Sequence, residues 1–439
     1  MPIKYTHDLI VIGAGAGGLG AAGFGAAVGL NVALIDKAAK NFGGDCLNYG
    51  CIPSKALLHV ASLFQKGREA QEFGFQTSGK ADFKKVMEYV HGQQDIIRAH
   101  ETPEVLDEEW GTKSIIGTAT LTGKNEVTVN GKKLTAPKIV LATGSIPRKL
   151  DVEGNDLLKI YDNESLFWEL DELPDHLLIV GGGPIGCEMA QAFRRLGSEV
   201  TIVNRGKALL AGDPPQMGQI LETRLRKEGI NILHRTEIAK FTSATGADLR
   251  PAKGSGENFI EATSLQFSHV LSAIGRVVRT EGLGLGLDAA GVEVKKGKIV
   301  TDDYYRTTNP NIYAVGDALG QEQFSHGAEM HNIGLWNNIL SPIKKKHSLE
   351  HFTWVTFTDP EVASFGWTEK DLQDRGIDYE TKEISLKDDD RAVSADYRYG
   401  HLIMYLSKGG LFSGPKILGG CMIAPAAGEM IQELHLMNQ

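Results

Sequence analysis

Two segments of the chain share one order of apolar and small residues. The first covers residues 7–37 and reads HDLIVIGAGAGGLGAAGFGAAVGLNVALIDK. The second covers residues 175–205 and reads DHLLIVGGGPIGCEMAQAFRRLGSEVTIVNR. Each starts with an apolar run typical of a buried strand, passes through a glycine-rich turn into a predicted helix, and ends in a second apolar run. The pattern therefore predicts two strand–helix–strand units.

The glycines of the two turns repeat at a constant separation. They form two G-x-G-x-x-G patterns that lie 168 residues apart, Gly13, Gly15 and Gly18 in the first and Gly181, Gly183 and Gly186 in the second. In such a turn the glycines permit a sharp bend, close approach to a pyrophosphate and packing of helix on strand. The helix N-terminus then favours the negative charge of the phosphates. One pattern alone is weak, and a turn without a ligand is the alternative, but the repeated pair predicts two dinucleotide-binding domains.

The residue at the end of each second strand predicts which dinucleotide is bound. Asp36, followed by Lys37, can accept hydrogen bonds from both ribose hydroxyls in the first unit. The second unit has Asn204 and Arg205 at the equivalent positions, which suits a 2′-phosphate. An exposed arginine without a ligand is the alternative. We therefore expect a permanently bound flavin dinucleotide, FAD, and a nicotinamide cofactor, with NADP(H) favoured over NAD(H).

Later segments complete an α/β fold with a separate C-terminal part. PSKALLHVASLF, from Pro53, reads as a helix, whereas HLIMYLS and ILGGCMI near the end read as antiparallel strands. Glycine and proline positions suggest a split FAD domain, residues 1–148 and 271–340, around an NAD(P) domain, residues 149–270. Residues 344–439 would form a third, α+β domain. The expected fold is two Rossmann-like domains followed by this C-terminal domain.

Composition limits the possible partners and surroundings. The chain has 439 residues, a formal net charge of -9 and four cysteines. No long basic stripe is present, which argues against a nucleic-acid partner. The apolar N-terminal run is threaded with glycine and ends on Asp36 and Lys37, so neither a membrane span nor a signal peptide is expected. Few cysteines in a long chain argue against a secreted disulfide scaffold, and we expect a cytoplasmic protein.

Two of the four cysteines, Cys46 and Cys51, lie in GGDCLNYGCIPSK. As a structural staple, a disulfide between them would close a very small ring and add little stability. As a metal site, the pair lacks further cysteine or histidine ligands at zinc spacing, and no metal is expected. A redox pair is the remaining interpretation. Cys51 would lie near the N-terminus of the predicted helix, where that end and Lys55 favour a thiolate.

GGDCLNYGCIPSK resembles the redox-active motif of the flavin-dependent pyridine nucleotide–disulfide oxidoreductases, the family of dihydrolipoyl dehydrogenase, glutathione reductase and mercuric reductase. The resemblance extends over almost the whole chain and includes the glycine patterns and four further segments, IVLATGSIPR, SAIGRVVRT, TTNPNIYAVGDA and FTDPEVASFGWTE. It implies that the C-terminal domain forms the interface of a homodimer. CIPSKALL is more similar to the dihydrolipoyl and mercuric branches than to the glutathione branch.

The resemblance also implies roles for single residues. Cys46 would exchange with substrate, Cys51 would face the flavin, Lys55 would pair with Glu188, and Asp317 would hydrogen bond to the flavin's ribityl chain. From the sequence alone, the favoured interpretations are a helix-surface carboxylate for Glu188 and a turn or helix-cap residue for Asp317. Further cofactor-binding positions implied by these motifs are Gly44, Ala142, Thr143, Gly144, Ile185, Gly275, Gly316, His326 and Ala328. His326, in FSHGAEMHNIG, could be a flavin neighbour or only a residue near a helix cap.

The C-terminal region departs from the family pattern. The family's acid–base group is a histidine followed by proline, and this chain has no His-Pro pair. His435 falls within a predicted helix and is more typical of a helix-surface residue. We therefore expect that the interface domain lacks its C-terminal end or that the proton is handled differently.

Three functions remain compatible with the sequence. The first is a dithiol/disulfide oxidoreductase similar to dihydrolipoyl dehydrogenase, with a small-molecule disulfide as substrate. The second is an NADPH-dependent reductase of a soft metal ion, similar to mercuric reductase. The third belongs to another class, a flavin-binding interaction protein without turnover, against which the intact cysteine pair, Lys55 and Glu188 argue.

Overall fold

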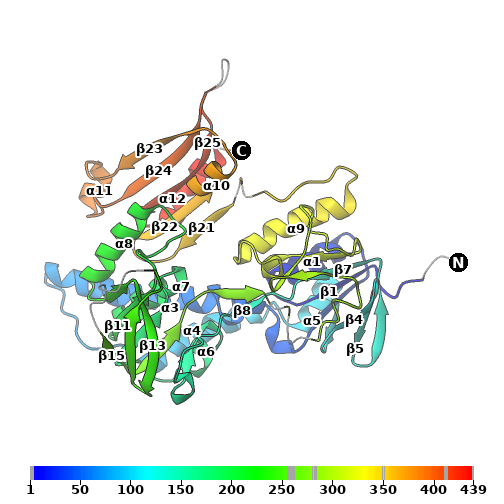
Figure 1. Cartoon of the computed structure of the whole chain (residues 1–439), viewed down its shortest axis with the longest axis horizontal. Coiled ribbons are helices and arrows are strands. Elements are labelled where there is room, and N and C mark those ends of the chain that lie inside the picture. The colour runs from blue at the N-terminus through cyan, green and yellow to red at the C-terminus, as the bar shows by residue number, and fades with distance from the viewer. Residues whose placement is uncertain are drawn as a thin grey trace. The chain divides into compact units, whose positions relative to one another are not determined.

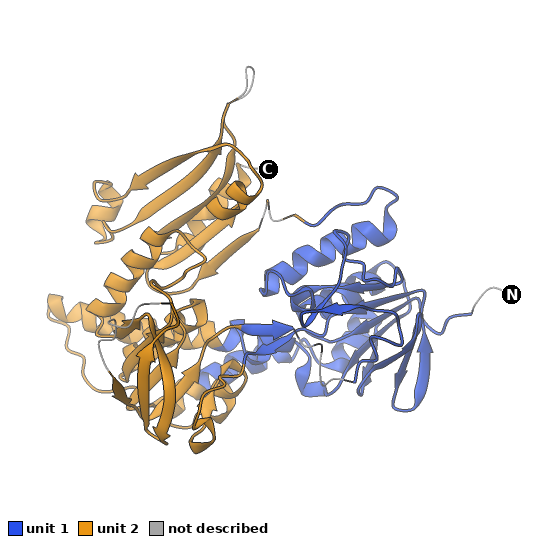
Figure 2. Ribbon diagram, in the orientation of Figure 1, with its two compact units in different colours: residues 1–53, 88–148, 276–347 blue, residues 54–87, 149–275, 348–439 orange. Residues whose placement is uncertain are grey.

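The structure, a computed structural model, describes residues 4–254, 263–278, 280, 284–348, 350, 352–409 and 414–437 (Figure 1). The chain divides into two compact units, each made of three separate segments (Figure 2). Unit 1 contains residues 1–53, 88–148 and 276–347, and unit 2 contains residues 54–87, 149–275 and 348–439. Two helices, α3 (Cys51–Glu69) and α4 (Phe83–Arg98), continue from one unit into the other.

A five-stranded parallel sheet is the centre of unit 1. Its order is β20-β7-β1-β2-β3. The strands are β1 (Leu9–Ile12), β2 (Val32–Asp36), β3 (Lys113–Ile116), β7 (Lys138–Leu141) and β20 (Ile312–Ala314). β1 is buried along its whole length because the sheet is covered on both faces, and this explains its continuous apolar sequence.

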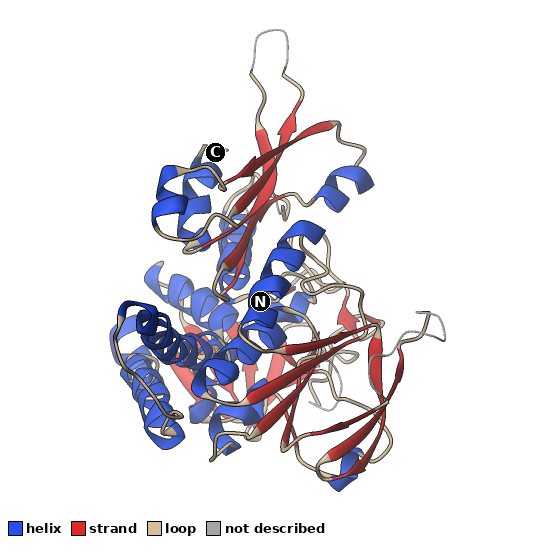
Figure 3. Cartoon of the chain, turned by 90° about the vertical axis from the view of Figure 1, so that its left-hand side faces the viewer, coloured by secondary structure: helices blue, strands red, loops and turns tan. Residues whose placement is uncertain are grey.

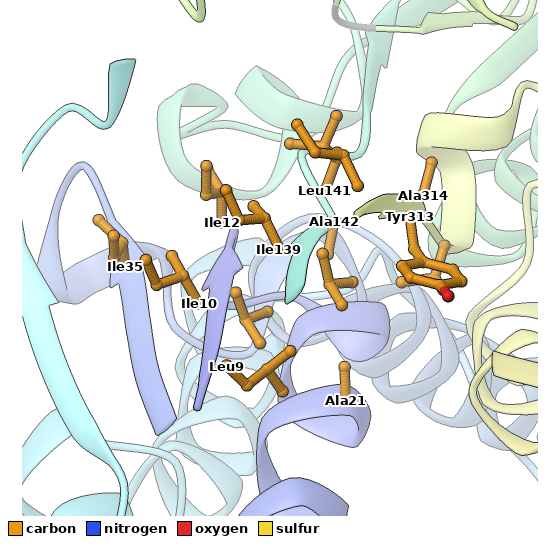
Figure 4. Packing of buried hydrophobic residues seen from close by; sticks show 14 of the residues in the cluster. Leu9, Ile10, Ile12, Ala21, Ile35, Ile139, Leu141, Ala142, Tyr313 and Ala314 are labelled. Atoms are coloured by element: carbon orange, nitrogen blue, oxygen red, sulfur yellow. The ribbon is translucent and has the colours of Figure 1, made fainter. Parts of the chain in front are cut away.

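The core of unit 1 lies where this sheet meets helix α1 (Ala16–Ala27) (Figure 4). Leu9, Ile10 and Ile139 are buried, and each such side chain contributes about 1.5–3 kcal/mol to folding. The small residues of α1 let helix α9 (Ser325–Leu340) pack closely against it. A methyl group added to Gly25 would lie 3.1 Å from the indole of Trp336 on α9. The glycine-rich sequence of α1 therefore serves packing as well as the turn before it.

Unit 1 also contains short helices and small antiparallel sheets. β4, β5 and β6 form one sheet, β8 pairs with β17, and β18 pairs with β19. These elements are η1 (Ala39–Asn41), α2 (Gly44–Asn48), α5 (Pro103–Val105), η3 (Leu106–Trp110), β4 (Thr120–Gly123), β5 (Glu126–Val129), β6 (Lys132–Thr135), β8 (Ser145–Pro147), β17 (Arg276–Val278), β18 (Val294–Lys295), β19 (Lys298–Ile299) and η5 (Gly316–Leu319).

Unit 2 repeats the strand–helix–strand arrangement in a second parallel sheet of order β12-β11-β10-β16-β9. Its strands are β9 (Ile160–Tyr161), β10 (His176–Val180), β11 (Glu199–Asn204), β12 (Asn231–His234) and β16 (His269–Ser272). Helix α7 (Pro184–Leu196) follows β10 as α1 follows β1. The two predicted units are thus present at the predicted separation. Around them lie η2 (Ala70–Phe73), η4 (Asn155–Leu157), α6 (Asn163–Glu169), α8 (Pro215–Lys227), β13 (Thr236–Ser243), β14 (Gly246–Pro251) and β15 (Ser264–Gln266).

The C-terminal part of unit 2 is an antiparallel sheet of order β21-β22-β25-β24-β23, with its strands and helices distinguished in Figure 3. Ala427 and Ile431 of helix α12 pack on its core. The elements are β21 (Thr353–Thr356), β22 (Glu361–Gly366), α10 (Glu369–Asp374), β23 (Tyr379–Ser385), α11 (Asp390–Ser394), β24 (His401–Ser407), β25 (Ile417–Ala424) and α12 (Ala427–Leu436). The antiparallel strands predicted from HLIMYLS and ILGGCMI are β24 and β25.

The expected α/β fold class is confirmed, with two parallel sheets and a C-terminal α+β part. The predicted boundary at residue 271 falls inside β16, which pairs with β10 in unit 2. Within the described residues, no helix combines the length and the apolar character that crossing a membrane requires.

Candidate functional site

The first glycine turn leaves no room for side chains. Gly13 has φ +105°, and a Cβ there would lie 2.2 Å from the carbonyl oxygen of Ala142. A Cβ on Gly18 would lie 1.7 Å from the carbonyl oxygen of Gly13. Gly44 approaches equally closely, because its Cβ would lie 2.4 Å from the Cα of Gly15. The structure therefore brings the first glycine turn, Ala142 and the segment before Cys46 together.

Asp36 ends β2 beside this turn, and its carboxylate is anchored by the chain. One carboxylate oxygen accepts a hydrogen bond from the backbone N–H of Ala14 at 3.0 Å. The other accepts from the side chain of Asn41 at 2.8 Å. Each carboxylate oxygen has more than one acceptor position, so Asp36 can still accept hydrogen bonds from a ribose. Lys37, the next residue, is exposed.

Asp317 lies in the short helix η5, within a chain of polar contacts that sequence reasoning missed. Arg276 donates from Nε to the hydroxyl of Ser145 at 2.7 Å, and Ser145 donates to the carboxylate of Asp317 at 2.5 Å. Arg276 also pairs with Asp45 at 3.0 Å. Burial raises the pKa of Asp317, and the hydrogen bond from Ser145 opposes that rise. Both Ser145 and Arg276 fall in the quoted motifs, which were the available signal for this network.

The residues around the first glycine turn fit a flavin dinucleotide. The hydroxyl oxygen of Thr143 is buried and has no hydrogen-bond partner among the described residues, which marks a place for a ligand's polar group. Gly144 has φ +73° and open space where a side chain would stand. Backbone N–H groups at the start of α1 can donate hydrogen bonds to a pyrophosphate, and the carboxylate of Asp36 can accept hydrogen bonds from ribose hydroxyls. These groups are therefore those of a dinucleotide site. The carboxylate of Asp317 is available to accept a hydrogen bond from a different part of the same ligand.

Gly316 and Ala328 meet at the start of η5. A Cβ on Gly316 would lie 3.3 Å from the methyl carbon of Ala328. The N–H of Gly316 donates to Nδ1 of buried His331 at 3.1 Å, so the proton of a neutral His331 is on Nε2. Nε2 of His331 lies 3.4 Å from a carboxylate oxygen of Glu322. Nε2 of His347 lies 3.3 Å from the same oxygen.

The group Glu322, His331 and His347 has the residue types of a metal site. However, an imidazole that accepts at Nδ1 and carries its proton on Nε2 has no lone pair for a metal at Nε2. Burial acts to raise the pKa of Glu322, but the contacts with the two histidines outweigh it and lower that pKa to about 2. The group is best described as a carboxylate held by two imidazoles.

Cys46 and Cys51 lie together at the N-terminus of α9, close enough for a contact between their side chains. Cys46 is in the short helix α2, whereas Cys51 is the first residue of α3. The hydroxyl of Ser325, the first residue of α9, is 3.2 Å from the sulfur of Cys51. Sequence reasoning missed Ser325, although FSHGAEMHNIG had been noted. The predicted helix starts two residues earlier than Pro53, which is tolerated because proline's missing N–H has no helical partner in the first turn.

The two thiols differ in their surroundings. The hydrogen bond with Cys51 and burial both raise the pKa of the Cys46 thiol, Ser325 opposes that rise, and the charge of Glu101 adds to it. Cys46, but not Cys51, lines a cavity of about 710 Å³ in unit 1. A molecule entering this cavity therefore meets Cys46 first.

Lys55 and Glu188, whose pairing the resemblance implied, are in contact in unit 2. Nζ of Lys55 is 3.1 Å from the carboxylate of Glu188, which is buried. The second carboxylate oxygen accepts from the N–H of Phe357 at 2.9 Å, and Lys55 also lies 4.4 Å from the centre of the Phe357 ring. Glu188 is thus part of a buried network and not a helix-surface carboxylate. Lys55 lies one helical turn after Cys51 on α3.

The second glycine turn repeats the first within unit 2. Gly181 has φ +119°, and a Cβ there would lie 2.4 Å from the carbonyl oxygen of Ala273. A Cβ added to Gly183 would have no described atom within 4 Å, which allows a ligand to approach the backbone at the start of α7. Ile185 is exposed on the same turn of helix, and Gly275 has φ +102° with open space beside it. A Cβ on Gly186 would lie 2.1 Å from the carbonyl oxygen of Gly181.

Asn204 and Arg205 play different structural roles at the end of β11. Asn204 is buried, donates to the carbonyl oxygen of Ala208 at 2.8 Å and accepts from the N–H of Gly206 at 3.2 Å. Arg205 is exposed. Asn204 therefore shapes the loop, and Arg205 carries the charge available to a ligand.

The remaining predicted positions lie on helices. His326 is the second residue of α9, and its ring is 5.4 Å from that of Phe324. His435 lies in the last turn of α12, as expected. Sequence reasoning also missed Gln94 of α4. Its side chain donates hydrogen bonds to the carbonyl oxygens of Leu47 and Asn48. It fixes the segment that joins the two cysteines.

Comparisons with known proteins agree with this arrangement. Residues 7–338 match the pyridine nucleotide-disulphide oxidoreductase family, and residues 352–439 match that family's dimerisation domain. The chain is 34% identical to a mercuric reductase of Streptomyces lividans, over 97% of this chain and 88% of that protein. It is 32% identical to a dihydrolipoyl dehydrogenase of Chlamydia muridarum, over 99% of this chain and 90% of that protein. A solved structure, the Cu(II) complex of the HOCl-induced flavoprotein disulfide reductase RclA from Escherichia coli, is similar with a TM-score of 0.81 and 25% identity, over 99% of this chain and 92% of that one.

Proposed function

Because the chain belongs to the pyridine nucleotide-disulphide oxidoreductase family, we propose that Cys46 and Cys51 are the redox pair through which it reduces a disulfide substrate with electrons from NAD(P)H. The observation that carries this proposal is the contact of the two thiols at the N-terminus of α9, with Ser325 beside Cys51 and a cavity beside Cys46. Such an end stabilises a thiolate, which is the reactive form of cysteine. The third function, a binding protein without turnover, leaves this arrangement unexplained.

FAD, when bound, supplies two-electron transfer between a nicotinamide and a dithiol. The chain's own residues bind and orient it. The backbone N–H groups at the start of α1 would hold the pyrophosphate, Asp36 would accept from the ribose, and Asp317 would accept from the ribityl chain. The contact of Ser145 with Arg276 fixes the orientation of Asp317.

Cys46 and Cys51 have separate tasks in this proposal. Cys46 attacks the substrate because it lines the cavity, and Cys51 then closes the Cys46–Cys51 disulfide and releases the second product thiol. Lys55, held by Glu188, adds positive charge one turn along the same helix and favours the thiolate of Cys51. In the dihydrolipoyl direction, the same steps run in reverse.

The nicotinamide cofactor is proposed to bind at the second glycine turn, with NADP(H) favoured over NAD(H). Gly183 admits the pyrophosphate, and the guanidinium of Arg205 is available for a 2′-phosphate. No carboxylate stands at the position of Asn204, whose side chain is committed to the loop. We also propose a homodimer formed by the C-terminal domain, and a cytoplasmic location.

A second candidate function is reduction of a soft metal ion. Two neighbouring thiols are good ligands for such an ion, and proteins named mercuric reductase are among the relatives. The carboxylates of the cavity beside Cys46 would also attract a cation.

An anaerobic titration of the purified yellow protein with NADPH tests the proposal. Uptake of two electrons with a new long-wavelength band supports a thiolate beside oxidised flavin, and the Cys51→Ser protein should lack that band. Bleaching of the flavin without the band in the wild type would overturn the redox pair. Turnover with lipoamide or with mercuric ion then separates the two candidate substrates.

A further inference from the structure

Glu101 shares the cavity with Cys46. It follows the end of α4, and its N–H donates to the carbonyl oxygen of Arg98 at 3.0 Å. One oxygen of its carboxylate lies against Gly43, since a Cβ on Gly43 would stand only 2.4 Å from it. Gly43 caps the short helix α2, which carries Cys46. The carboxylate is therefore positioned at the base of the helix that holds the thiol.

The carboxylate of Glu101 has no structural partner in the described part of the chain. It makes no hydrogen bond or ion pair there, although it is half-buried. None of the described residues that line the cavity is Lys, Arg or His. Burial raises the pKa of Glu101. The carboxylate of Glu101 therefore has no structural role among the described residues, and it is available to act on a molecule in the cavity.

Cys46 needs a proton acceptor if it is to attack a substrate. Its contact with Cys51, its burial and the charge of Glu101 all favour the thiol form. Ser325 can stabilise a thiolate, but a hydroxyl group cannot remove the proton near neutral pH. The other two carboxylates of the cavity, Glu109 and Glu329, are exposed, whereas Glu101 is half-buried and its charge acts on Cys46.

We propose that Glu101 is the proton-transfer group of Cys46, supplied by the same chain. The inference rests on the proposed disulfide exchange. Glu101 takes the proton of Cys46, directly or through one water, and the resulting thiolate attacks one sulfur of a disulfide RS–SR. The S–S bond breaks, and the leaving RS⁻ takes the proton from Glu101. Attack by Cys51 on Cys46 then releases the second RSH, so that the dithiol loses two electrons and the substrate gains two.

This role makes a prediction about leaving groups. An aliphatic thiolate is strongly basic and leaves faster when it is protonated, whereas an aromatic thiolate such as thiopyridine leaves without protonation. Glu101→Gln should therefore lower kcat/KM by about 100-fold with bis(2-hydroxyethyl) disulfide. With 4,4′-dithiodipyridine the loss should be smaller, about tenfold, because only the proton transfer from Cys46 is then affected. Glu104→Gln is the matched control, because Glu104 is exposed three residues further along.

A second readout does not depend on turnover. In the reduced holoenzyme, the rate of Cys46 alkylation by iodoacetamide is followed against pH, with the labelled peptide identified by mass spectrometry. Loss of the negative charge in Glu101→Gln should move the midpoint about 1 pH unit lower, and Glu101→Asp should restore part of the shift. An unchanged midpoint, or equal losses with both disulfides, would overturn the role of Glu101. A wild-type enzyme that reduces neither disulfide would overturn the proposed function and this inference together, whereas normal wild-type turnover with an unaffected Glu101→Gln enzyme would overturn only the inference.

Discussion

Ser325 connects the redox pair to helix α9. Its hydroxyl is 3.2 Å from the sulfur of Cys51, and it opposes the rise in the pKa of Cys46. A hydroxyl can donate to a thiolate, and it does so here at the helix end where the backbone also favours negative charge. One side chain thus acts on both sulfurs.

We expect Ser325→Ala to slow alkylation of the reduced thiols at pH 7 about tenfold, because the thiolate loses a hydrogen bond of about 1.5 kcal/mol. The measurement is the iodoacetamide rate on the reduced holoenzyme. Ser325→Thr, which keeps the hydroxyl, should react close to the wild-type rate. Equal rates for the alanine and wild-type proteins would contradict a contribution from Ser325.

Both carboxylate oxygens of Glu188 have partners within the protein. One forms an ion pair with Lys55, and the other accepts a hydrogen bond from the N–H of Phe357. We expect Glu188→Gln to lower the free energy of unfolding by about 1–3 kcal/mol, since it leaves the ammonium of Lys55 without its countercharge. Urea unfolding measures this, with Glu380→Gln on an exposed part of β23 as the control. A loss no larger than that of the control would mean that the ion pair is unimportant for stability.

Helix α1 and the turn before it form one steric unit. A Cβ at Gly18 would lie 1.7 Å from the carbonyl oxygen of Gly13, so even a methyl group there requires the helix to move away from the strand. By contrast, a Cβ added to Gly92 in α4 would have no atom of a described neighbour within 4 Å. The two glycines are both helical, but only the first is required by packing.

We therefore expect opposite effects from the same substitution. Gly18→Ala should lower FAD content several-fold, read from the ratio of flavin to protein absorbance, and should reduce stability by about 2–4 kcal/mol. Gly92→Ala should bind FAD normally and gain about 0.5–1 kcal/mol from helix propensity. Normal FAD content in Gly18→Ala would contradict the steric account of the turn.

The helices and strands that could be predicted from sequence are those whose formation is determined by residues close to them in the chain. The repeat gave β1, α1, β2, β10, α7 and β11, because strand and helix periodicities and glycine spacing act within about thirty residues. The start of α3 was placed two residues late, since proline is permitted throughout the first turn of a helix.

The polar networks of the site were less accessible to sequence reasoning. Arg276 contacts Asp45 and Ser145, and Ser325 contacts Cys51, across long separations in the chain that no local pattern reports. Glu101 is a single carboxylate in a polar loop, and its significance depends on the cavity beside it. The chemistry of the cysteine pair could be inferred, whereas the groups that tune it could not.

The stability of unit 1 as a whole should depend on acid through Glu322. Its pKa is lowered to about 2 by His331 and His347 against the effect of burial. A carboxylate whose pKa is lower in the folded than in the unfolded state adds stability above its unfolded pKa, 4.5 here, and this stability is lost as the pH falls toward 2.

Comparison of the wild type with Glu322→Gln in urea, with FAD in excess, measures this contribution. We expect the wild type to be more stable by about 1–2 kcal/mol at pH 6, after allowance for solvent screening. The difference should shrink when the measurement is repeated at pH 3. A difference that stays constant between these two pH values would show that the charge of Glu322 is not responsible.

The interrupted course of the chain through unit 1 has a consequence for synthesis on the ribosome. Strands β1, β2, β3 and β7 have all been made by residue 141, but their edge partner β20 starts at Ile312 and Asp317 comes later still. The parallel sheet of unit 2 is contiguous from β9 to β16 and can close first. For the time needed to translate about 170 residues, roughly 10–30 s, the nascent four-stranded sheet has an open edge at β7. During that interval it offers unpaired backbone to any neighbouring strand, so slow translation or a stalled ribosome should make this chain a client of chaperones that shield such edges.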